Sequence, residues 1–487
     1  MSVSLADISA RRSATIAQRL CNAGDSLSRS ALCEEGIVVR MIGLRLEAVG
    51  CRAAIGSYCQ IKTASGNDID AEVVGFDDDK LLLMAEGSTE GLMPGARVIP
   101  MQNSGRIQVG EAMVGRILDG SGNPIDFGRR LPEMDSFPLR GNKINPLNRV
   151  PISEPLDVGV RSINSLLTIG RGQRLGLFAG SGVGKTTLLG MMTRNTDADV
   201  VVIAMIGERG KEVRDFIETS LTKDGLKKAI VIATPADDSA LKRVHGAWLA
   251  TSIAEYFRAR GKHVLLLMDS LTRFAQAQRE IGLAIGEPPV TKGYTPSVFS
   301  LLPNLVERAG NGGADGGSIT AIYTVLVEGD DNQDPIADAA RAILDGHIVL
   351  SRQIADSGIF PAVDIESSIS RSMNQIVTED QRALALEFKS ILSTYNENRD
   401  LISIGAYEQG SDQRVDRSIR LIDQLTGFVS QDYKQKIDMH TSVGELFILG
   451  KKFAEVNATP IGQLQPQNGL VAQEGISREQ TADAGVA

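Results

Sequence analysis

The chain has 487 residues, with 51 lysines and arginines against 60 aspartates and glutamates, for a net charge of −9. This length suits roughly three domains of ~150 residues, and the acidic balance gives no general reason to expect a nucleic-acid partner. No stretch approaches ~18 consecutive apolar residues, and no apolar secretory signal opens the chain. We therefore expect a soluble cytoplasmic protein.

The four cysteines all lie within the first 60 residues, and no two have the C-x-x-C spacing. Free thiols in a reducing compartment are the expected state, in preference to disulfides or a metal site. The cysteines are Cys21, Cys33, Cys51 and Cys59.

The first 24 residues carry one helical pattern, over residues 4–20, where apolar side chains recur at helical spacing with arginines between them. One interpretation is a helix that binds a partner, and the other is a loosely docked N-terminal helix. The apolar positions are Leu5, Ile8, Ile16 and Leu20.

Residues 25–110 change character, with short β-branched or apolar runs such as 36–42 and 71–76 between glycine and aspartate turns. A turn every eight to twelve residues is typical of a small all-β barrel. No chemical motif is visible in this stretch, so we interpret it as a packing or assembly module. Prolines cluster between 124 and 155, where the chain crosses into the next domain.

Residues 111–371 alternate strands with helices, and their continuous apolar runs are typical of strands buried on both faces of a mostly parallel sheet. Ligands of such sheets bind at the carboxyl ends of the strands, where Ala179, Gly207 and Asp269 stand. The pattern becomes helical over 372–460, as in 379–392 and 416–425, and 461–487 has a disordered composition. The predicted strands are 174–178, 199–206, 228–233, 263–268 and 319–327.

The run from Arg174 to Leu189 reads as a strand, a glycine loop and a helix start, which is the order of a phosphate-binding P-loop. Its glycines let backbone N–H groups turn toward an anion at a helix N-terminus. The Lys185 side chain is suited to binding the β and γ phosphates, and the Thr186 hydroxyl is suited to binding Mg²⁺. The motif G-x-x-x-x-G-K-[ST] asks for glycine at position 179, where this chain has alanine. The predicted nucleotide-binding residues are Gly180, Ser181, Gly182, Val183, Gly184, Lys185, Thr186 and Thr187.

Polar residues follow two further apolar strands. Asp269 stands where a Walker B carboxylate holds Mg²⁺ beside the P-loop threonine, although a lone aspartate there is more often a helix cap. Glu208 is placed to orient or deprotonate a water aimed at the γ-phosphate, and Arg209 to meet phosphate oxygens. The alternative for Glu208 and Arg209 is a solvated ion pair. Arg371 completes such a site only if folding or a neighbouring subunit brings it near.

These motifs resemble, in the same order, those of the ATPases related to the α and β subunits of rotary ATP synthases. The resemblance covers about residues 25–455 and is carried by the P-loop, Gly-Glu-Arg-Gly from Gly207, Asp269 within Leu-Met-Asp-Ser-Leu-Thr-Arg-Phe, and Pro-Ala-Val-Asp…Ser-Ser-Ile-Ser-Arg ending at Arg371. It implies an N-terminal β-barrel, a RecA-like α/β core and a helical C-terminal domain. It also implies ATP and Mg²⁺ as ligands.

Further roles follow from the resemblance alone. It implies a homo-hexamer with nucleotide between subunits, in which Arg371 acts as a finger on the neighbour's γ-phosphate. Phe360 matches an aromatic residue that stacks on adenine, and Tyr407 is expected to flank the base. Non-catalytic subunits of the synthase carry glutamine where this chain has Glu208, so the carboxylate favours a working hydrolase.

Within that superfamily the chain is most similar to the flagellar type III protein-export ATPases, on phrases such as Gly-Tyr-Thr-Pro-Ser-Val-Phe-Ser-Leu-Leu-Pro from Gly293. The likeness implies a protein at the inner membrane of the flagellar base that releases or unfolds chaperone-bound substrates at the membrane export gate. It also implies a stator-like regulatory partner bound through the N-terminal helix and a central stalk-like component. An injectisome export ATPase, a structural nucleotide-binding subunit of a rotary synthase and a nucleic-acid translocase are the alternatives.

Overall fold

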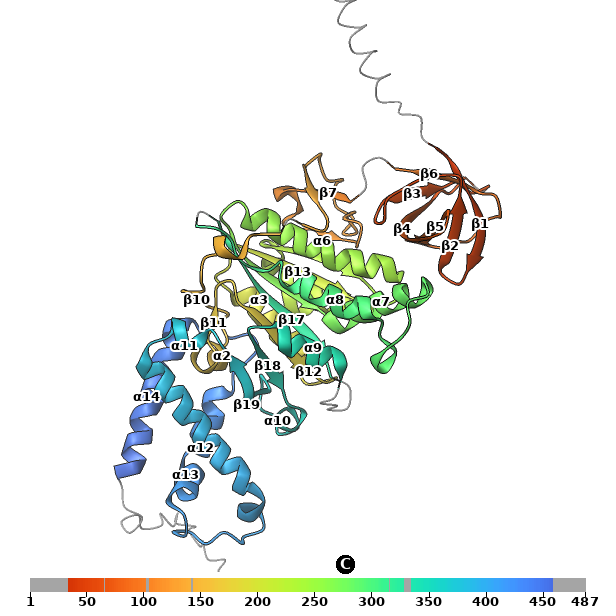
Figure 1. Cartoon of the computed structure of the whole chain (residues 1–487). Coiled ribbons are helices and arrows are strands. Elements are labelled where there is room, and N and C mark those ends of the chain that lie inside the picture. The colour runs from red at the N-terminus through yellow and green to blue at the C-terminus, as the bar shows by residue number, and fades with distance from the viewer. Residues whose placement is uncertain are drawn as a thin grey trace, which may run out of the picture.

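The computed structural model describes residues 34–64, 66–101, 105–141, 143–314, 316–327 and 334–458. Figure 1 shows three parts along the chain: a small barrel, a central α/β body and a helical C-terminal part at the opposite end from the barrel. The predicted N-terminal helix, Cys21, Cys33 and the predicted disordered tail lie outside the described residues. The predicted domain boundaries stay predictions.

Six antiparallel strands close into the N-terminal barrel in the order β1-β2-β5-β4-β3-β6. Their inward residues form a separate apolar cluster that includes Leu46, Ile61 and Leu83, because alternate residues of a strand face the same side. Cys51 and Cys59 are buried there, at 5% and 0% exposure. The strands are β1 (Gly36–Ile42), β2 (Arg45–Val49), β3 (Tyr58–Ile61), β4 (Ile69–Asp77), β5 (Lys80–Ala85) and β6 (Arg97–Pro100).

The central sheet has the order β19-β18-β12-β17-β15-β13-β14-β8, with β16 paired on β17. All neighbours on this path are parallel except β18 and β19, which are antiparallel. The fold class predicted from the sequence is confirmed. The strands are β8 (Ile117–Leu118), β12 (Arg174–Ala179), β13 (Val200–Ile206), β14 (Ala229–Thr234), β15 (His263–Asp269), β16 (Gly310–Asn311), β17 (Ser318–Leu326), β18 (Gly346–Leu350) and β19 (Val363–Ser370).

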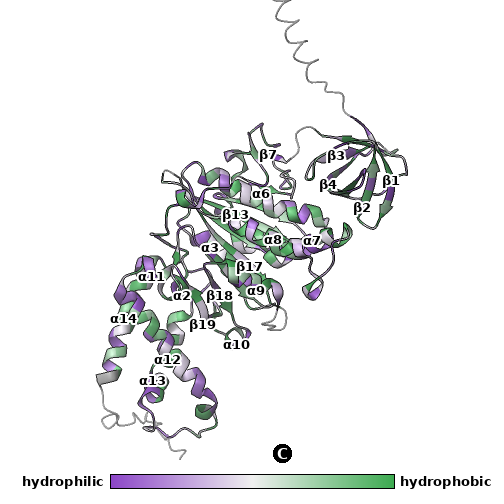
Figure 2. Ribbon diagram, viewed as in Figure 1, coloured by the Kyte–Doolittle hydropathy of each residue, from purple (hydrophilic) through white to green (hydrophobic). Residues whose placement is uncertain are grey.

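Both faces of this sheet are buried under helices. In β13, Val202 and Ala204 belong to one apolar core together with residues of α6 to α9, whereas Val201 and Ile203 belong to another with residues of α2, α3 and the C-terminal helices. This explains the continuous apolar runs in the sequence, which colour the central strands green in Figure 2. The helices are α2 (Arg161–Leu166), α3 (Lys185–Asn195), α4 (Gly210–Asp215), π-helical η3 (Phe216–Leu221), α5 (Thr222–Leu226), α6 (Ala240–Arg258), α7 (Leu271–Ala284), α8 (Pro296–Val306), α9 (Pro335–Ile343) and α10 (Arg352–Asp356).

Short elements join these parts. Between the barrel and the core, β7 (Arg106–Val109) pairs with β9 (Asp135–Pro138), and β10 (Pro155–Leu156) pairs with β11 (Ile169–Gly170). The 3₁₀ turns are η1 (Glu111–Met113), η2 (Pro146–Asn148) and η4 (Thr291–Gly293).

The C-terminal part is helical, as predicted: α11 (Met373–Ile376), α12 (Glu379–Ser403), α13 (Gln413–Val429) and α14 (Met439–Ala458). The chain enters α12 at Thr378, whose hydroxyl caps the helix by accepting from the Gln381 N–H. Phe388 and Phe428 bring α12 and α13 together, with ring centroids 5.7 Å apart. Over the described residues, no helix combines the length and apolar character needed to cross a bilayer.

Candidate nucleotide-binding active site

The glycine loop stands where the sequence predicted it, between the end of β12 at Ala179 and the start of α3 at Lys185. Gly182 and Gly184 have φ of 79° and 88°, a region that side chains other than glycine seldom adopt. Ala179 is the last residue of an extended strand and 1% exposed. The departure from the motif therefore falls where no glycine conformation is needed.

Three polar side chains meet at the carboxyl ends of neighbouring strands. Lys185 Nζ lies 2.7 Å from Asp269 Oδ1, at the end of β15, and 3.5 Å from Glu208 Oε1, just after β13. Thr324 of β17, the strand between β12 and β15, donates its hydroxyl to Asp269 Oδ1 at 2.6 Å. The parallel sheet thus brings together groups far apart in the sequence.

Glu208 has the most perturbed acidity in this cluster. Burial of its carboxyl group, reinforced by the neighbouring charge of Asp269, raises the pKa of Glu208 to about 7. Its Oε1 atom is buried and accepts no hydrogen bond from the described residues. Burial opposes the charge of Lys185, but the two carboxylates outweigh it and raise the pKa of that ammonium. The site therefore holds one fixed cation and one carboxylate poised near neutrality.

A cavity of about 890 Å³ opens in front of these groups. Most of the predicted site residues line it, namely Gly180, Ser181, Gly182, Gly184, Lys185, Thr186, Glu208 and Arg209. Val183 is buried and Thr187 exposed in the same segment, and neither lines the cavity. The Arg209 side chain is 85% exposed and pairs loosely with Glu212 at 3.9 Å.

Three arginines that the sequence did not single out also line the cavity. Arg352 of α10 donates to the Ser181 carbonyl at 3.3 Å. Arg243 of α6 pairs with Glu280 at 2.7 Å, and Arg273 of α7 donates to Gln276 at 2.7 Å. These arginines add positive charge, which suits a polyanionic ligand, to a lining that also carries Glu208, Glu212, Asp215 and Glu280.

Known protein families match the three parts of this chain. Three family models match: the β-barrel domain of the ATP synthase α/β family over residues 38–102, its nucleotide-binding domain over 159–370, and the C-terminal domain of type III secretion ATPases, described for EscN, over 377–447. The flagellum-specific ATP synthase of Pseudomonas aeruginosa is 58% identical, over 82% of this chain and 89% of its own, and that of Salmonella typhimurium is 54% identical, over 85% and 93%. The chain belongs to the flagellum-specific ATP synthase branch of the ATP synthase α/β family.

Solved structures of a type III secretion ATPase share the fold of this chain. The assembled ATPase EscN from the type III secretion system of enteropathogenic E. coli superposes with a TM-score of 0.81 at 42% identity, covering 85% of this chain and 99% of that one. The same ATPase in complex with its central stalk EscO gives 0.78. This member of the flagellum-specific ATP synthases is an ATPase, and the cavity at the P-loop lies within its matched nucleotide-binding domain.

The two aromatic residues predicted beside the base have different surroundings. Phe360 is 46% exposed, and its ring lies 3.5 Å from where a Cβ on Gly184 would stand. Tyr407 does not line the cavity; its hydroxyl donates to the Asp412 carbonyl at 2.9 Å and to Asp416 at 3.0 Å, near the start of α13. Adenine stacking stays a prediction for both residues.

Arg371 lies at the side of the sheet where the parallel strands begin, whereas the glycine loop lies at the side where they end. It follows β19, and its N–H donates to the carbonyl of Asp345, whose carboxylate accepts from the N–H of Arg174 at the start of β12. The P-loop follows the end of β12, roughly 20 Å away at about 3.3 Å per residue. A cis role in this chain's own cavity is therefore excluded by distance.

The residues present fit a magnesium ion bound mainly through its ligand. Among the described residues, no three His, Cys, Asp or Glu side chains are arranged to hold a metal. Mg²⁺ commonly binds through one or two protein oxygens, completed by phosphate oxygens and water. Thr186 lines the cavity and Asp269 is fixed beside it, so the oxygen donors expected from the sequence are available.

Thr324, Arg243, Arg273 and Arg352 are among the cavity and cluster residues that the sequence analysis did not identify. Thr324 stands inside an apolar strand and Arg243 inside a helix, so their local patterns resemble those of ordinary core and surface positions. The signal that points to Arg273 is its place four residues after Asp269, one turn into α7.

Proposed function

We propose that the chain is the Mg²⁺-dependent ATP hydrolase that energises protein export by the flagellar type III apparatus. One observation carries the catalytic part of this proposal: the buried Glu208 carboxylate has a pKa near 7 and lies 3.5 Å from the P-loop lysine, and one of its oxygens accepts no hydrogen bond from the described residues. A general base works best when its pKa lies near the working pH. A structural nucleotide-binding subunit has no use for such a group.

Each residue of the cluster then has a role. The loop N–H groups and Lys185 hold the β and γ phosphates, and Thr186 and Asp269 hold Mg²⁺, which neutralises charge on the phosphates. Glu208 orients the attacking water and accepts its proton, and Arg209 binds phosphate oxygens. Thr324 keeps Asp269 oriented through its hydroxyl.

The working unit in this proposal is a homo-hexamer. Arg371 lies at the sheet edge remote from its own P-loop, which suits a finger that enters the neighbouring subunit's cavity. Such a finger accelerates related reactions about 10³- to 10⁵-fold. Phe360, beside the glycine loop, supplies an adenine-stacking surface, and Tyr407 is a second candidate for it.

The partners proposed are those of an export machine. The EscN structure solved with its central stalk EscO supports a stalk-like partner for the ring. A stator-like protein at the N-terminal segment, chaperone-bound substrates and the membrane export gate complete the set, with the protein cytoplasmic and peripheral to the inner membrane. No nucleic acid is included.

A deletion strain tests the export role. We expect loss of flagella and motility, restored by the wild-type gene and not by Glu208→Gln, with oxidative ATP synthesis unchanged. An injectisome ATPase would instead leave motility intact and abolish secretion of effector proteins, and a rotary synthase subunit would impair growth on respiratory substrates. Either result would overturn the flagellar assignment.

A further inference from the structure

The barrel contacts helix α6 through a buried ionic cluster centred on His245. Nε2 of His245 lies 2.5 Å from Glu72 Oε2 of β4, and Nδ1 lies 3.0 Å from Glu86 Oε1, just after β5. Tyr58 of β3 places its hydroxyl 2.8 Å from Nδ1 and donates to Glu86 at 3.0 Å. Three separate barrel segments thus converge on one imidazole of the ATPase core.

This imidazole is held as a cation. Both ring nitrogens face carboxylate oxygens, so each donates a proton only when the ring is protonated. Burial alone would lower the pKa of His245, but its hydrogen bonds to Glu72 and Glu86 outweigh that effect and raise the pKa to about 9. Two further charged groups lie beside the cluster: Arg140, 3.5 Å from Glu72 and largely exposed, and Asp70, whose charge acts on Glu86 and Tyr58.

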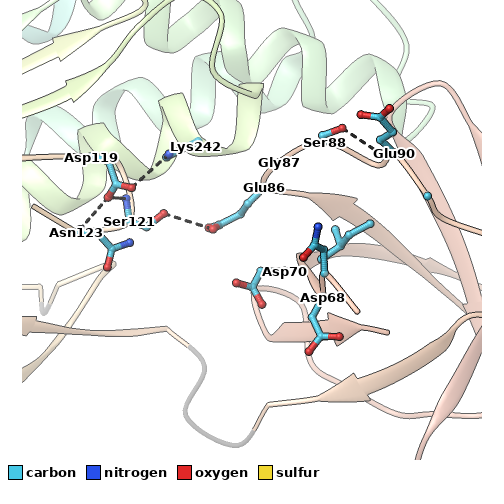
Figure 3. A pocket seen from close by; sticks show the side chains of 13 residues that line it. Asp68, Asp70, Glu86, Gly87, Ser88, Glu90, Asp119, Ser121, Asn123 and Lys242 are labelled. Carbon is cyan, nitrogen blue, oxygen red and sulfur yellow. Dashed lines mark hydrogen bonds and ion pairs between the residues drawn. The ribbon is translucent and has the colours of Figure 1, made fainter. Parts of the chain in front are cut away.

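Further contacts fix the same end of α6 to the barrel. The cap of α6, Ser239, donates its hydroxyl to the Glu86 carbonyl at 2.7 Å. Figure 3 shows the Glu86 side chain projecting from the barrel toward Ser121 of the core, and Lys242 of α6 reaching Asp119. The barrel therefore holds the first two turns of α6.

Those two turns also form part of the active site. Arg243, two residues before His245, lines the nucleotide cavity and pairs with Glu280 of α7. Gly246, the residue after His245, brings α6 so close to the sheet that a Cβ there would lie 2.7 Å from Thr234 Cγ2 and 3.2 Å from Ile206 Cδ1. Ile206 ends the strand that precedes Glu208. One helical segment thus contacts the barrel on one side and the catalytic strand on the other.

We propose that His245 is a positioning residue for ATP hydrolysis: its contacts with Glu72 and Glu86 of the barrel fix the start of α6, and thereby Arg243 and the strand end that carries Glu208. This inference rests on the catalytic part of the proposed function, not on the export role. Displacements of about 1 Å in a catalytic geometry cost up to about 100-fold in rate, so loosening this helix is expected to lower kcat with little effect on KM.

Purified full-length protein tests the inference through two readouts, steady-state ATP hydrolysis at 25 °C and hydrogen exchange of the α6 amides. His245→Gln removes the cation, His245→Lys retains a charge that reaches the same carboxylates, and His263→Gln is the matched control. His263 is a half-buried histidine of the same domain whose Nδ1 contacts Ser318, away from the barrel.

We expect His245→Gln to speed exchange over residues 240–246 and to lower kcat about tenfold, with KM within twofold. His245→Lys should restore most of kcat, and His263→Gln should match wild type. Wild-type kcat should also fall above pH 9, where the imidazolium, facing Glu72, Glu86 and Tyr58, loses its proton, and His245→Lys should shift that fall to higher pH.

Two results would overturn the inference: unchanged exchange over 240–246 in His245→Gln, or faster exchange with an unchanged kcat. Failure of the export role is a separate outcome, since it would show as a motile deletion strain and would leave these in vitro rates untouched. Thermal unfolding of each variant, recorded beside the assays, identifies any loss of rate that comes from unfolded protein.

Discussion

Lys185 Nζ lies 2.7 Å from Asp269 Oδ1, and among the described residues it is the one cation in an ion pair with that carboxylate. The same ammonium faces Glu208 at 3.5 Å. Two buried carboxylates therefore share a single positive charge, and the acidity of Glu208 depends on where that charge lies. Binding of phosphates by Lys185 would remove part of its field from both carboxylates.

Replacing Lys185 with alanine should abolish ATP hydrolysis, with kcat/KM reduced at least about 10³-fold, because phosphate contact and carboxylate neutralisation are lost together. The matched control is Lys211→Ala, which removes an exposed lysine of α4 that does not line the cavity. Steady-state phosphate release measures both. Hydrolysis by Lys185→Ala at the rate of Lys211→Ala would contradict the assigned site.

The pH dependence of hydrolysis should report Glu208. Burial raises the pKa of this carboxyl group to about 7, so it is protonated below that pH and cannot accept a proton from water. We expect kcat/KM to fall about tenfold per pH unit below about pH 7, while affinity for a fluorescent nucleotide changes less. A flat profile down to pH 5.5 would exclude Glu208 as the base.

Thr324→Val should impair the site without unfolding the protein. The change removes the hydroxyl that donates to Asp269 Oδ1 at 2.6 Å, a hydrogen bond to a charged group worth about 1.5–3 kcal/mol. We expect kcat to fall about tenfold. Thr320→Val is the control in the same strand, because its hydroxyl accepts from the Gly172 N–H at the other end of the sheet and its loss should lower stability alone. Equal kcat in the two variants would argue against a role for Thr324.

Arg371→Ala should keep nucleotide binding and lose turnover about 10³-fold or more. Mixing Arg371→Ala with Glu208→Gln subunits tests whether the arginine acts between subunits. In mixed rings, an intact Glu208 meets an intact Arg371 at some interfaces, so activity should reappear although each variant alone is inactive. Mixtures as inactive as their components would exclude a finger acting in trans.

The sequence predicted those site residues that lie directly after a recognisable strand or loop motif in the chain. Asp269 ends an apolar strand, Glu208 follows one within two residues, and Lys185 begins the helix after the glycine loop that follows β12, so a parallel sheet had to bring them to one edge. The limits of the five predicted strands shifted by one residue at most. Thr324 was missed because it stands inside a strand that reads as uniformly buried. His245 was missed because its partners belong to another domain, and no local pattern reports a contact between domains.

The antiparallel pairing of β18 with β19 has a consequence for when ATP is consumed. A parallel last strand would have delivered Arg371 to the same rim as the glycine loop, whereas the reversed strand delivers it to the far rim. If Arg371 acts on the neighbouring subunit, an isolated subunit would bind nucleotide without hydrolysing it. ATP would be hydrolysed only where subunits have assembled side by side, which couples ATP consumption to completed assembly.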